Sequence, residues 1–370
     1  MRPTQKLMIC IFAFATYVIQ AHAQTSVREE NILLPIQIGS HTETVETLVV
    51  RPLEGSKFPI ALIVNGSFEA SPSAEHADWL AHLAHDFANR GFLAASIVWP
   101  GYGRSSGKFW DNGGTCVNPN VAGFLDAHGK ELRAMLESLR KRSDVDPSLA
   151  VGVGISIGGA SMLELAAEEN HPLTAVINIS GGVYHYMKVG SFDAECELYQ
   201  AELVRNMAFF GKDNPTPTLW FYAENDPFFG PVLVKKMLQA YREEGGVAKL
   251  VALHRFGKNG HTLYKIEAAA LLNSHIDSFL RLNYLPALDD SGLIRLLSGL
   301  TPAQRVDAQG YLQSSTEKAL AVSEKTGRIY WHYAARTLDL ARKLAVSDCQ
   351  RATNEPCHLL AENMSVTSGQ

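Results

Sequence analysis

Apolar segments of strand length alternate with amphipathic segments over most of the chain. Runs such as "FPIALIV" and "LAVGVGI" are apolar throughout, whereas the segments between the runs have helical spacing, at residues 75–90, 124–142, 157–169, 231–244 and 265–282. Strands that are apolar on both faces are typical of a parallel sheet covered by helices. The pattern therefore predicts an α/β fold with a mostly parallel twisted sheet and helices on both of its faces.

The pattern changes after a linker, "LPALDDSG", at residues 285–292. Beyond about residue 300 the elements are short: a strand in "KALAVS", a helix that Thr337 can cap, and a strand in "HLLAENMSV". We expect one large domain over residues 24–288 and a small α+β module over residues 300–370. The core of this module is slight for a domain of its length, so a covalent cross-link would help to stabilise it.

The first 23 residues have the features of a signal peptide. Arg2 and Lys6 precede an apolar stretch at 7–19, and Ala21-His22-Ala23 offers the small residues of a cleavage site. The apolar stretch is too short for a membrane anchor. We expect cleavage before Gln24 and export to the periplasm or the medium.

Composition and cysteine content narrow the class of protein. The chain has 370 residues, a net charge of −5 and no basic patch, which argues against a nucleic-acid partner. No apolar stretch after the leader is long enough to span a membrane, so no membrane contact is expected in the mature chain. After export, an even number of cysteines suggests two disulfides, Cys349 with Cys357 and Cys116 with Cys196. Zinc is the alternative, but the cysteines and histidines lack zinc-site spacing.

One serine lies among glycines directly after an apolar strand. "GISIG", residues 154–158, fits the pattern G-x-S-x-G between a strand and a helix of small residues. In that context Ser156 would be a nucleophile on a sharp turn. The alternative is that the glycines serve only close packing of the helix on the sheet.

A serine nucleophile needs a base and an acid at neighbouring strand ends. His261 follows the last predicted strand, whereas His254 lies within that strand pattern and His76, His82 and His85 suggest surface positions on or beside a helix. Asp226 ends the preceding strand, just before Pro227, and Glu224 is the alternative acid. The order Ser156, Asp226, His261 is the one that this architecture uses.

The transition state also needs backbone donors for its oxyanion. The N–H of Ile157 follows the nucleophile, and the second donor would be the N–H of Ser67, with Phe68 as its neighbour. An ordinary strand-to-helix turn is the alternative for the Ser67 loop. Arg104 would either bind an acidic substrate or be held by local carbonyls. Further candidates for the pocket wall are Trp99, Trp110, Phe228 and Phe229.

The segments "LIVNGS", "WPGYGRSSG", "GVGISIGGAS", "PTLWFYAENDPFFGP" and "GKNGHTLY" resemble the α/β-hydrolase superfamily, and within it exported dienelactone hydrolase-like serine esterases. They span about residues 45–285. The resemblance implies an α/β-hydrolase catalytic domain with Ser156 as nucleophile, Asp226 as acid and His261 as base. The chain departs from the pattern at Asn65, where many relatives have histidine, and at Ser156, where the name-giving enzymes have cysteine.

The resemblance implies an exported hydrolase that cleaves a small-molecule carboxylic ester through an acyl-enzyme, with no metal or organic cofactor. Two other functions stay open from the sequence. One is a peptidase or amidase that uses the same three residues. The other is a hydrolase fold that serves as a non-catalytic binding module.

Overall fold

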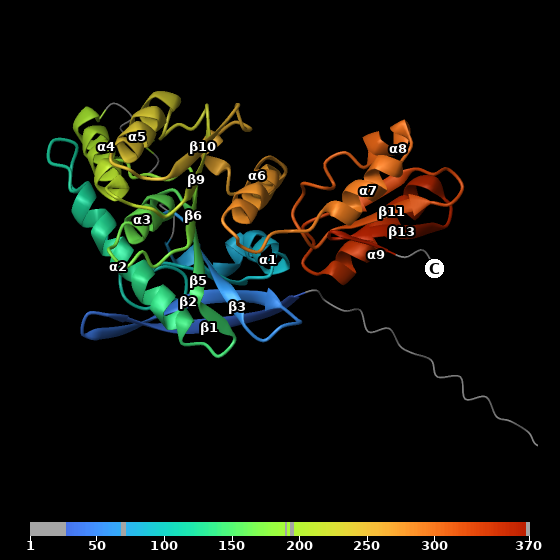
Figure 1. The fold of residues 1–370 in the computed structure, drawn as a ribbon, viewed down its shortest axis with the longest axis horizontal. Helices are drawn as coiled ribbons and strands as arrows, with labels where there is room; N and C mark the ends of the chain where they lie inside the picture. Colours follow the sequence, from blue (N-terminus) through green and yellow to red (C-terminus); the bar gives the residue numbers. More distant parts are fainter. Residues whose placement is uncertain (1–26, 68–71, 189–190, 193–195, 368–370) are drawn as a thin grey trace, which may run out of the picture.

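The computed structural model describes residues 27–67, 72–188, 191–192 and 196–367 (Figure 1). The expected signal peptide, residues 1–23, and Phe68 lie outside the described residues. An eight-stranded sheet with the order β1-β2-β4-β3-β5-β6-β9-β10 forms the centre of the larger part. Its strands are β1 (Val27–Ile38), β2 (His41–Pro52), β3 (Phe58–Val64), β4 (Leu93–Ile97), β5 (Val145–Ile155), β6 (Ala175–Ile179), β9 (Thr218–Ala223) and β10 (Ala248–Leu253).

The expected parallel sheet is confirmed from β4 to β10, where all neighbouring strands pair in parallel. The start of the sheet differs from the expectation, because β1 and β2 form an antiparallel hairpin and β2 also pairs antiparallel with β4. The sequence pattern did not predict strand β1. Its residues alternate between buried and exposed positions, as on an edge strand that covers the core with one face only.

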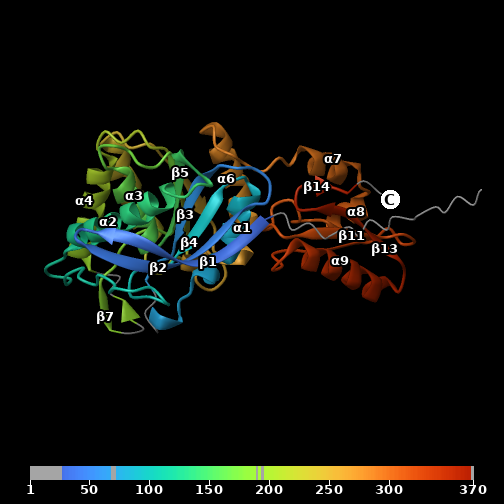
Figure 2. The same ribbon diagram turned by 90° about the horizontal axis from the view of Figure 1, so that it is seen from below.

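Helices cover both faces of this sheet (Figures 1 and 2). Helices α1 (Ala81–Asn89) and α6 (Ala269–Leu282) lie on one side, and α2 (Val121–Arg140), α3 (Ile157–Ala166) and α4 (Glu197–Gly211) lie on the other. Helix α5 (Pro231–Glu243) packs against α4. The sequence pattern did not predict α4, whose apolar and polar residues are poorly segregated. A small hairpin, β7 (Tyr186–Lys188) and β8 (Ser191–Phe192), precedes α4.

The C-terminal module is built on a separate antiparallel sheet with the order β12-β11-β13-β14. Its strands are β11 (Ala319–Ser323), β12 (Ile329–His332), β13 (Cys357–Glu362) and β14 (Ser365–Val366). Helix α9 (Leu338–Thr353) packs on this sheet, and the Thr337 side chain caps it by accepting a hydrogen bond from Leu340 N.

Two further helices belong to this module, α7 (Ser291–Gly299) and α8 (Pro302–Asp307). Leu293 of α7 is fully buried in the same apolar cluster as Leu320 of β11 and Ile329 of β12. The residues from 291 to 299, taken from the sequence as the end of a linker and a gap, therefore pack with the C-terminal sheet.

Four cysteines are paired in two disulfides. Cys116 lies before α2 and Cys196 directly before α4, with their Cα atoms 5.6 Å apart. Cys349 in α9 is bonded to Cys357 at the start of β13, with a Cα–Cα distance of 6.2 Å. These are the two pairs that the sequence suggests. The second pair ties α9 to the sheet on which it packs.

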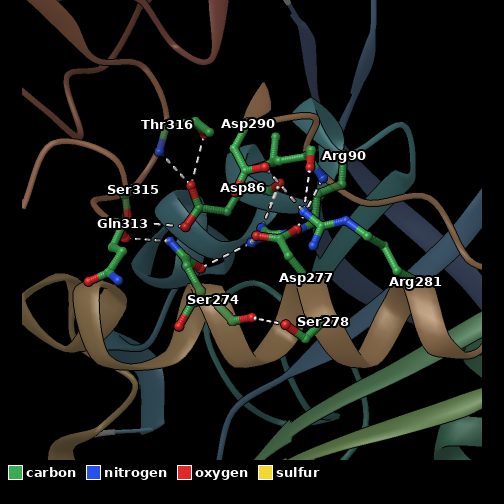
Figure 3. Close-up of polar contacts among 12 residues, drawn as sticks. Asp86, Arg90, Ser274, Asp277, Ser278, Arg281, Asp290, Gln313, Ser315 and Thr316 are labelled. Carbon is green, nitrogen blue, oxygen red and sulfur yellow. Dashed lines mark hydrogen bonds and ion pairs between the residues drawn. The ribbon is translucent and has the colours of Figure 1, made fainter. Parts of the chain in front are cut away.

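Buried polar contacts join the module to α1 and α6 (Figure 3). The carboxylate of Asp86 in α1 accepts hydrogen bonds from Thr316 N (2.6 Å), Thr316 Oγ1 (2.8 Å) and Ser315 Oγ (3.0 Å). Asn273 in α6 donates to the Gln313 carbonyl at 3.1 Å. The module is therefore attached by fixed hydrogen-bond geometry rather than only by a flexible linker.

Candidate active site

Ser156 occupies a sharp turn between the end of β5 and the start of α3. Its φ of +55° and ψ of −122° are rare for a residue with a Cβ atom. The Ser156 N–H donates to the Ile179 carbonyl of β6 at 3.0 Å, and the residue is 6% exposed. Such strain persists only where the surrounding structure enforces it, and it is typical of functional sites.

The glycines around Ser156 have a steric role. A Cβ atom on Gly154 would overlap the Gly158 carbonyl, and one on Gly158 would lie 2.7 Å from the Asn65 carbonyl oxygen. A Cβ on Gly66 would lie 2.7 Å from Ser156 Cβ. Close packing, the alternative interpretation of the motif, is therefore present. It also brings the loop after β3 directly against Ser156.

Asp226 and His261 form a hydrogen-bonded pair at the ends of two adjacent strands, β9 and β10. Asp226 Oδ2 lies 3.0 Å from His261 Nδ1, and its Oδ1 accepts from Phe228 N (2.9 Å) and Phe229 N (3.1 Å). The Asp226 side chain is completely buried, whereas that of His261 is 13% exposed. This arrangement fixes the imidazole ring and leaves a small part of the His261 side chain accessible.

The two loops that carry this pair are tied together by Asn225. Its side-chain oxygen accepts from Phe256 N at 2.8 Å, and its carbonyl accepts from Gly260 N at 3.2 Å. A Cβ atom on Gly260 would lie 2.7 Å from Asp226 N. The backbone on either side of the pair is therefore closely packed.

Gly182, after β6, connects Ser156 to this pair. Its N–H donates to the Ser156 carbonyl at 3.0 Å, and a side chain at this position would overlap the Phe229 ring. The ring of Phe229 lies 5.7 Å from that of His261, centroid to centroid, and the Phe228 ring lies at 4.7 Å. Ser156, Asp226 and His261 thus share one cluster of contacts at the carboxyl edge of the sheet, where such folds bind ligands.

The alternative acid is placed differently. The Glu224 side chain is 46% exposed, and its Oε2 lies 3.8 Å from Nδ1 of His254. His254 follows β10 and its side chain is fully exposed, so the expectation that it belongs to the strand was wrong. Glu224 is therefore paired with a surface histidine, and Asp226 is paired with His261.

The two expected oxyanion donors lie at the same edge of the sheet. Ile157 is the first residue of α3, and Ser67 follows Gly66 in the loop after β3. Because Gly66 packs against Ser156, the Ser67 loop and the start of α3 flank the serine from two sides. Phe68, the neighbouring candidate, is outside the described residues.

Arg104 is held by a carboxylate, and no carbonyl group in the described part of the chain accepts a hydrogen bond from its side chain. Its N–H donates to Glu46 Oε2 at 2.7 Å, and its Nε lies 3.2 Å from the same oxygen. The Glu46 side chain is 5% exposed and also contacts His76 Nδ1 at 3.2 Å. Burial alone would raise the pKa of Glu46. Hydrogen bonds from Arg104, His76 and Ala77 outweigh burial and lower the pKa. Glu46 therefore joins the loop at 101–106 to the segment that leads into α1.

The aromatic candidates for the pocket wall fall into two groups. Phe228 and Phe229 flank His261, as described above. Trp99 is fully buried in the core, where its Nε1 donates to the Asn65 carbonyl at 2.9 Å, and Trp110 is half exposed in the loop before α2. Trp99 is thus a core residue that holds the loop after β3 through its hydrogen bond to Asn65, and it does not line an open surface.

The sequence pattern did not predict the burial of two other polar side chains, those of Glu75 and His85. Glu75 is 1% exposed, and burial raises its pKa to about 7. His85 was taken as a surface residue, but it is 7% exposed and bonded through Nε2 to Glu29 at 2.7 Å. Both lie in the segment that the sequence predicts as one helix, and their burial could not be read from its periodicity.

Within the described ranges there is no group of histidine, cysteine, aspartate or glutamate residues arranged to hold a metal ion. No helix in that part of the chain is long and apolar enough to cross a membrane.

No protein-family model and no curated protein matches this sequence. The fold, in contrast, is similar to many solved structures. A Pyrococcus furiosus esterase aligns with a TM-score of 0.50 at 11% identity, covering 70% of this chain and 91% of the esterase. The structure of Est1E from Butyrivibrio proteoclasticus, with ferulic acid bound, gives 0.47 at 16% identity over 68% of this chain and 98% of Est1E.

A dienelactone hydrolase-like promiscuous phosphotriesterase from metagenomic libraries gives a TM-score of 0.43 at 17% identity, covering 62% of this chain and 82% of that enzyme. Taken with the strand order and the covering helices, the similarity to the Pyrococcus furiosus esterase shows that the chain has the α/β-hydrolase fold. A small C-terminal module with an antiparallel sheet follows it.

Proposed function

We propose that the protein is an exported serine hydrolase that cleaves carboxylic esters. One observation carries the proposal. A strained serine at the end of β5 lies in the same cluster of contacts as a hydrogen-bonded Asp226–His261 pair at the ends of β9 and β10. A serine becomes an effective nucleophile only where a base can take its proton, and a histidine held by a carboxylate is the usual base.

In the proposed reaction, Ser156 Oγ attacks the ester carbonyl and His261 Nε2 accepts its proton. The Asp226 carboxylate keeps the proton of His261 on Nδ1 and stabilises the imidazolium. The amides of Ser67 and Ile157 donate hydrogen bonds to the oxyanion. His261 then protonates the leaving alcohol, and water, activated by the same histidine, hydrolyses the acyl-enzyme.

Labelling with a fluorophosphonate probe, together with turnover of p-nitrophenyl esters, tests this proposal. Ser156→Ala should abolish both labelling and nearly all turnover. Ser180 provides the matched control, because it is also buried, has a φ of +49° and directly follows the adjacent strand β6. Ser180→Ala should still be labelled. Wild-type turnover in Ser156→Ala, or a probe adduct on Ser180, would contradict the proposal.

Export rests on separate observations. The leader-like sequence at 1–23 and the two disulfides both fit a protein that matures in an oxidising compartment. The intact mass of the protein recovered from the periplasm or medium should correspond to a chain that begins at Gln24. A mass that retains residues 1–23 would contradict this part of the proposal.

A further inference from the structure

Glu75 contacts Asn65 in the loop after β3, and the next residue of that loop, Gly66, packs against Ser156. Glu75 precedes η2 (Ala77–Leu80), and its side chain is buried. The Asn65 side chain donates a hydrogen bond to the Glu75 carboxyl group. The charge of Glu75 also contributes to raising the pKa of Tyr264, behind the larger effect of burial. Tyr264 is three residues beyond His261 in the chain.

Asn65 is held at both its main chain and its side chain. The carbonyl accepts from Trp99 Nε1 and lies against Gly158 at the start of α3, whereas the side chain bonds to Glu75. The next residue, Gly66, packs against Ser156. The orientation of Asn65 therefore sets the position of the loop that carries the Ser67 amide.

The segment that carries Glu75 is itself anchored. Ala77 N and His76 Nδ1 both contact the buried carboxylate of Glu46, and the Ser96 hydroxyl donates to the Ala77 carbonyl at 2.7 Å. The carboxyl group of Glu75 is thus presented to Asn65 from a fixed backbone. A side chain fixed in this way can hold its partner in one orientation.

The buried carboxyl group of Glu75 lowers the stability of the folded protein. Its Oε2 has no hydrogen-bond partner within the described part of the chain, and burial disfavours its charged form. An apolar side chain of similar size would avoid that cost. Perturbed carboxyl groups occur both at functional sites and in structural packing, so the bond to Asn65, and not the raised pKa, links Glu75 to the candidate active site.

We propose that Glu75 is a positioning residue, which holds Asn65 and through it fixes the oxyanion loop at Ser67. This inference rests on the proposed ester hydrolysis and adds a part to it. Glu75 touches neither the substrate nor the reacting atoms in this scheme. Its effect on the reaction passes through the orientation of one amide donor, which matters in the transition state more than in the bound substrate.

The test compares Glu75→Ala, Glu75→Gln and Asn65→Ala in the full mature chain. Glu75→Ala should lower kcat about 10- to 100-fold and leave KM within about 3-fold, because a displaced oxyanion donor weakens transition-state stabilisation. Glu75→Gln keeps a carbonyl acceptor for Asn65, so it should restore kcat to within about 3-fold of wild type.

A double-mutant cycle separates positioning from general destabilisation. If Glu75 acts through Asn65, the Asn65→Ala/Glu75→Ala double variant should lose little more kcat than either single variant. Glu164 is the matched control, since it is a half-buried residue on α3 whose buried Oε2 faces Gly129 of α2, and burial raises its pKa to about 8. Glu164→Ala should leave kcat unchanged.

The outcomes distinguish this inference from the proposed function. A wild-type protein that is neither labelled by the fluorophosphonate nor active on esters would overturn both. A labelled, active wild type with normal kcat in Glu75→Ala would overturn the role of Glu75 alone. Additive losses in the double variant, or no rescue by Glu75→Gln, would also overturn it. If Glu75→Ala fails to fold, Asn65→Ala with normal kcat would still contradict the inference.

Discussion

The segment from Glu75 to Arg90 contacts two buried polar regions, and the two are built differently. At its C-terminal end, Arg90 donates to both oxygens of Asp277 in α6, through Nε at 2.8 Å and Nη2 at 3.0 Å (Figure 3). Asp277 Oδ1 also accepts from Leu288 N at 3.1 Å, and Asp86 accepts three hydrogen bonds from residues 315 and 316. We call this region, from Asp86 to Arg90 with residues 273–277 and 313–317, the junction.

At the N-terminal end of the same segment, the polar groups are less completely paired. Glu75 bonds to Asn65 but has one oxygen with no partner among the described residues. Burial also lowers the pKa of His82 in the first turn of α1, although its Nε2 contacts the Tyr264 carbonyl at 2.9 Å. Ser156, nearby, has a strained backbone.

The difference separates two uses of buried polar groups. A fully paired network fixes the relative orientation of the elements that carry it, and loss of one member is costly. A strained or half-paired group costs stability and persists where function selects it. The junction therefore has the properties of a network that fixes the orientation of the module, and the region around Ser156 and Glu75 has those expected of the proposed reaction site. The predictions below test this contrast.

The largest effect should come from Asp226→Asn at the strand ends. The amide would favour the wrong tautomer of His261, and kcat should fall on the order of 10⁴-fold if the site behaves like other triads. The free energy of unfolding should change far less than the activity. Ester turnover and urea unfolding measure the two. Glu224→Gln is the control, because Glu224 is half exposed and near His254, and it should retain near-normal turnover.

At the junction we expect a large loss of stability with little change in activity. Asp277→Asn leaves the buried Arg90 guanidinium without its counter-charge, and breaking such a pair costs about 3–5 kcal/mol of folding free energy. Turnover per folded molecule should remain near the wild-type value. Asp126→Asn is the control, since the Asp126–Lys130 pair is more than half exposed and should contribute less than about 1 kcal/mol. A large fall in kcat for folded Asp277→Asn would contradict the contrast.

The sequence predicted where Ser156, Asp226 and His261 lie much better than it predicted the contacts of the junction. Ser156, Asp226 and His261 each follow an apolar strand, and parallel strands bring their carboxyl ends to one edge, so local pattern and topology sufficed to place them together. Asp86 and Arg90 look like ordinary polar residues of an amphipathic helix. Their partners lie about 190 to 230 residues further along the chain, and nothing in the local sequence indicates such partners.

The other differences between expectation and structure also arise because a local sequence pattern does not show which other segments pack against a residue. Strand β1 covers the core with one face only, so its pattern lacks the continuous apolar run of the central strands. Glu75 is bonded to Asn65 of the loop after β3, and His85 contacts Glu29 of β1 and Glu317 of the C-terminal module, so their partners lie in other elements. The catalytic roles of Ser156, Asp226 and His261, in contrast, are a prediction that the experiments above must test.

A smaller effect on stability is expected for Glu75→Gln. The pKa of Glu75 is about 7 in the folded protein and about 4.5 in the unfolded chain, so the folded state holds the proton between these values. Stability of the wild type therefore falls as pH rises from about 4.5 to 7. Glu75→Gln should gain up to about 3 kcal/mol at pH 8 relative to pH 4.

Glu164→Gln should gain stability over a similar pH range, because burial also raises the pKa of Glu164, to about 8. The two variants allow Glu75, near the candidate active site, to be compared with Glu164, which is remote from it in role. Both glutamates cost stability, but of the two alanine variants only Glu75→Ala should lower kcat. Urea unfolding at pH 4, 6 and 8 measures the first property. A Glu75→Gln variant without any pH-dependent gain would show that Glu75 is not desolvated as the structure indicates.

The smallest effect should come from His85, at the edge of the junction. Burial alone would lower its pKa, but Glu317 and Glu29 outweigh burial and raise it. Its Nε2 lies 2.7 Å from Glu29 of β1, and its Nδ1 lies 3.7 Å from Glu317, before β11. His82, three residues earlier in α1, is affected by His85 in turn: burial lowers the pKa of His82, and the charge of His85 adds to that effect.

Because the folded pKa of His85 is raised, its pairs stabilise the protein fully below the pKa of the unfolded histidine. That contribution is lost as pH rises through the folded pKa. The stability difference between wild type and His85→Asn should therefore be larger at pH 5.5 than at pH 8.5 in urea unfolding. His254→Asn is the control, because the His254 side chain is fully exposed, and its difference should stay nearly constant. A pH-independent difference for His85→Asn would mean that its charge does not contribute to joining the module to α1.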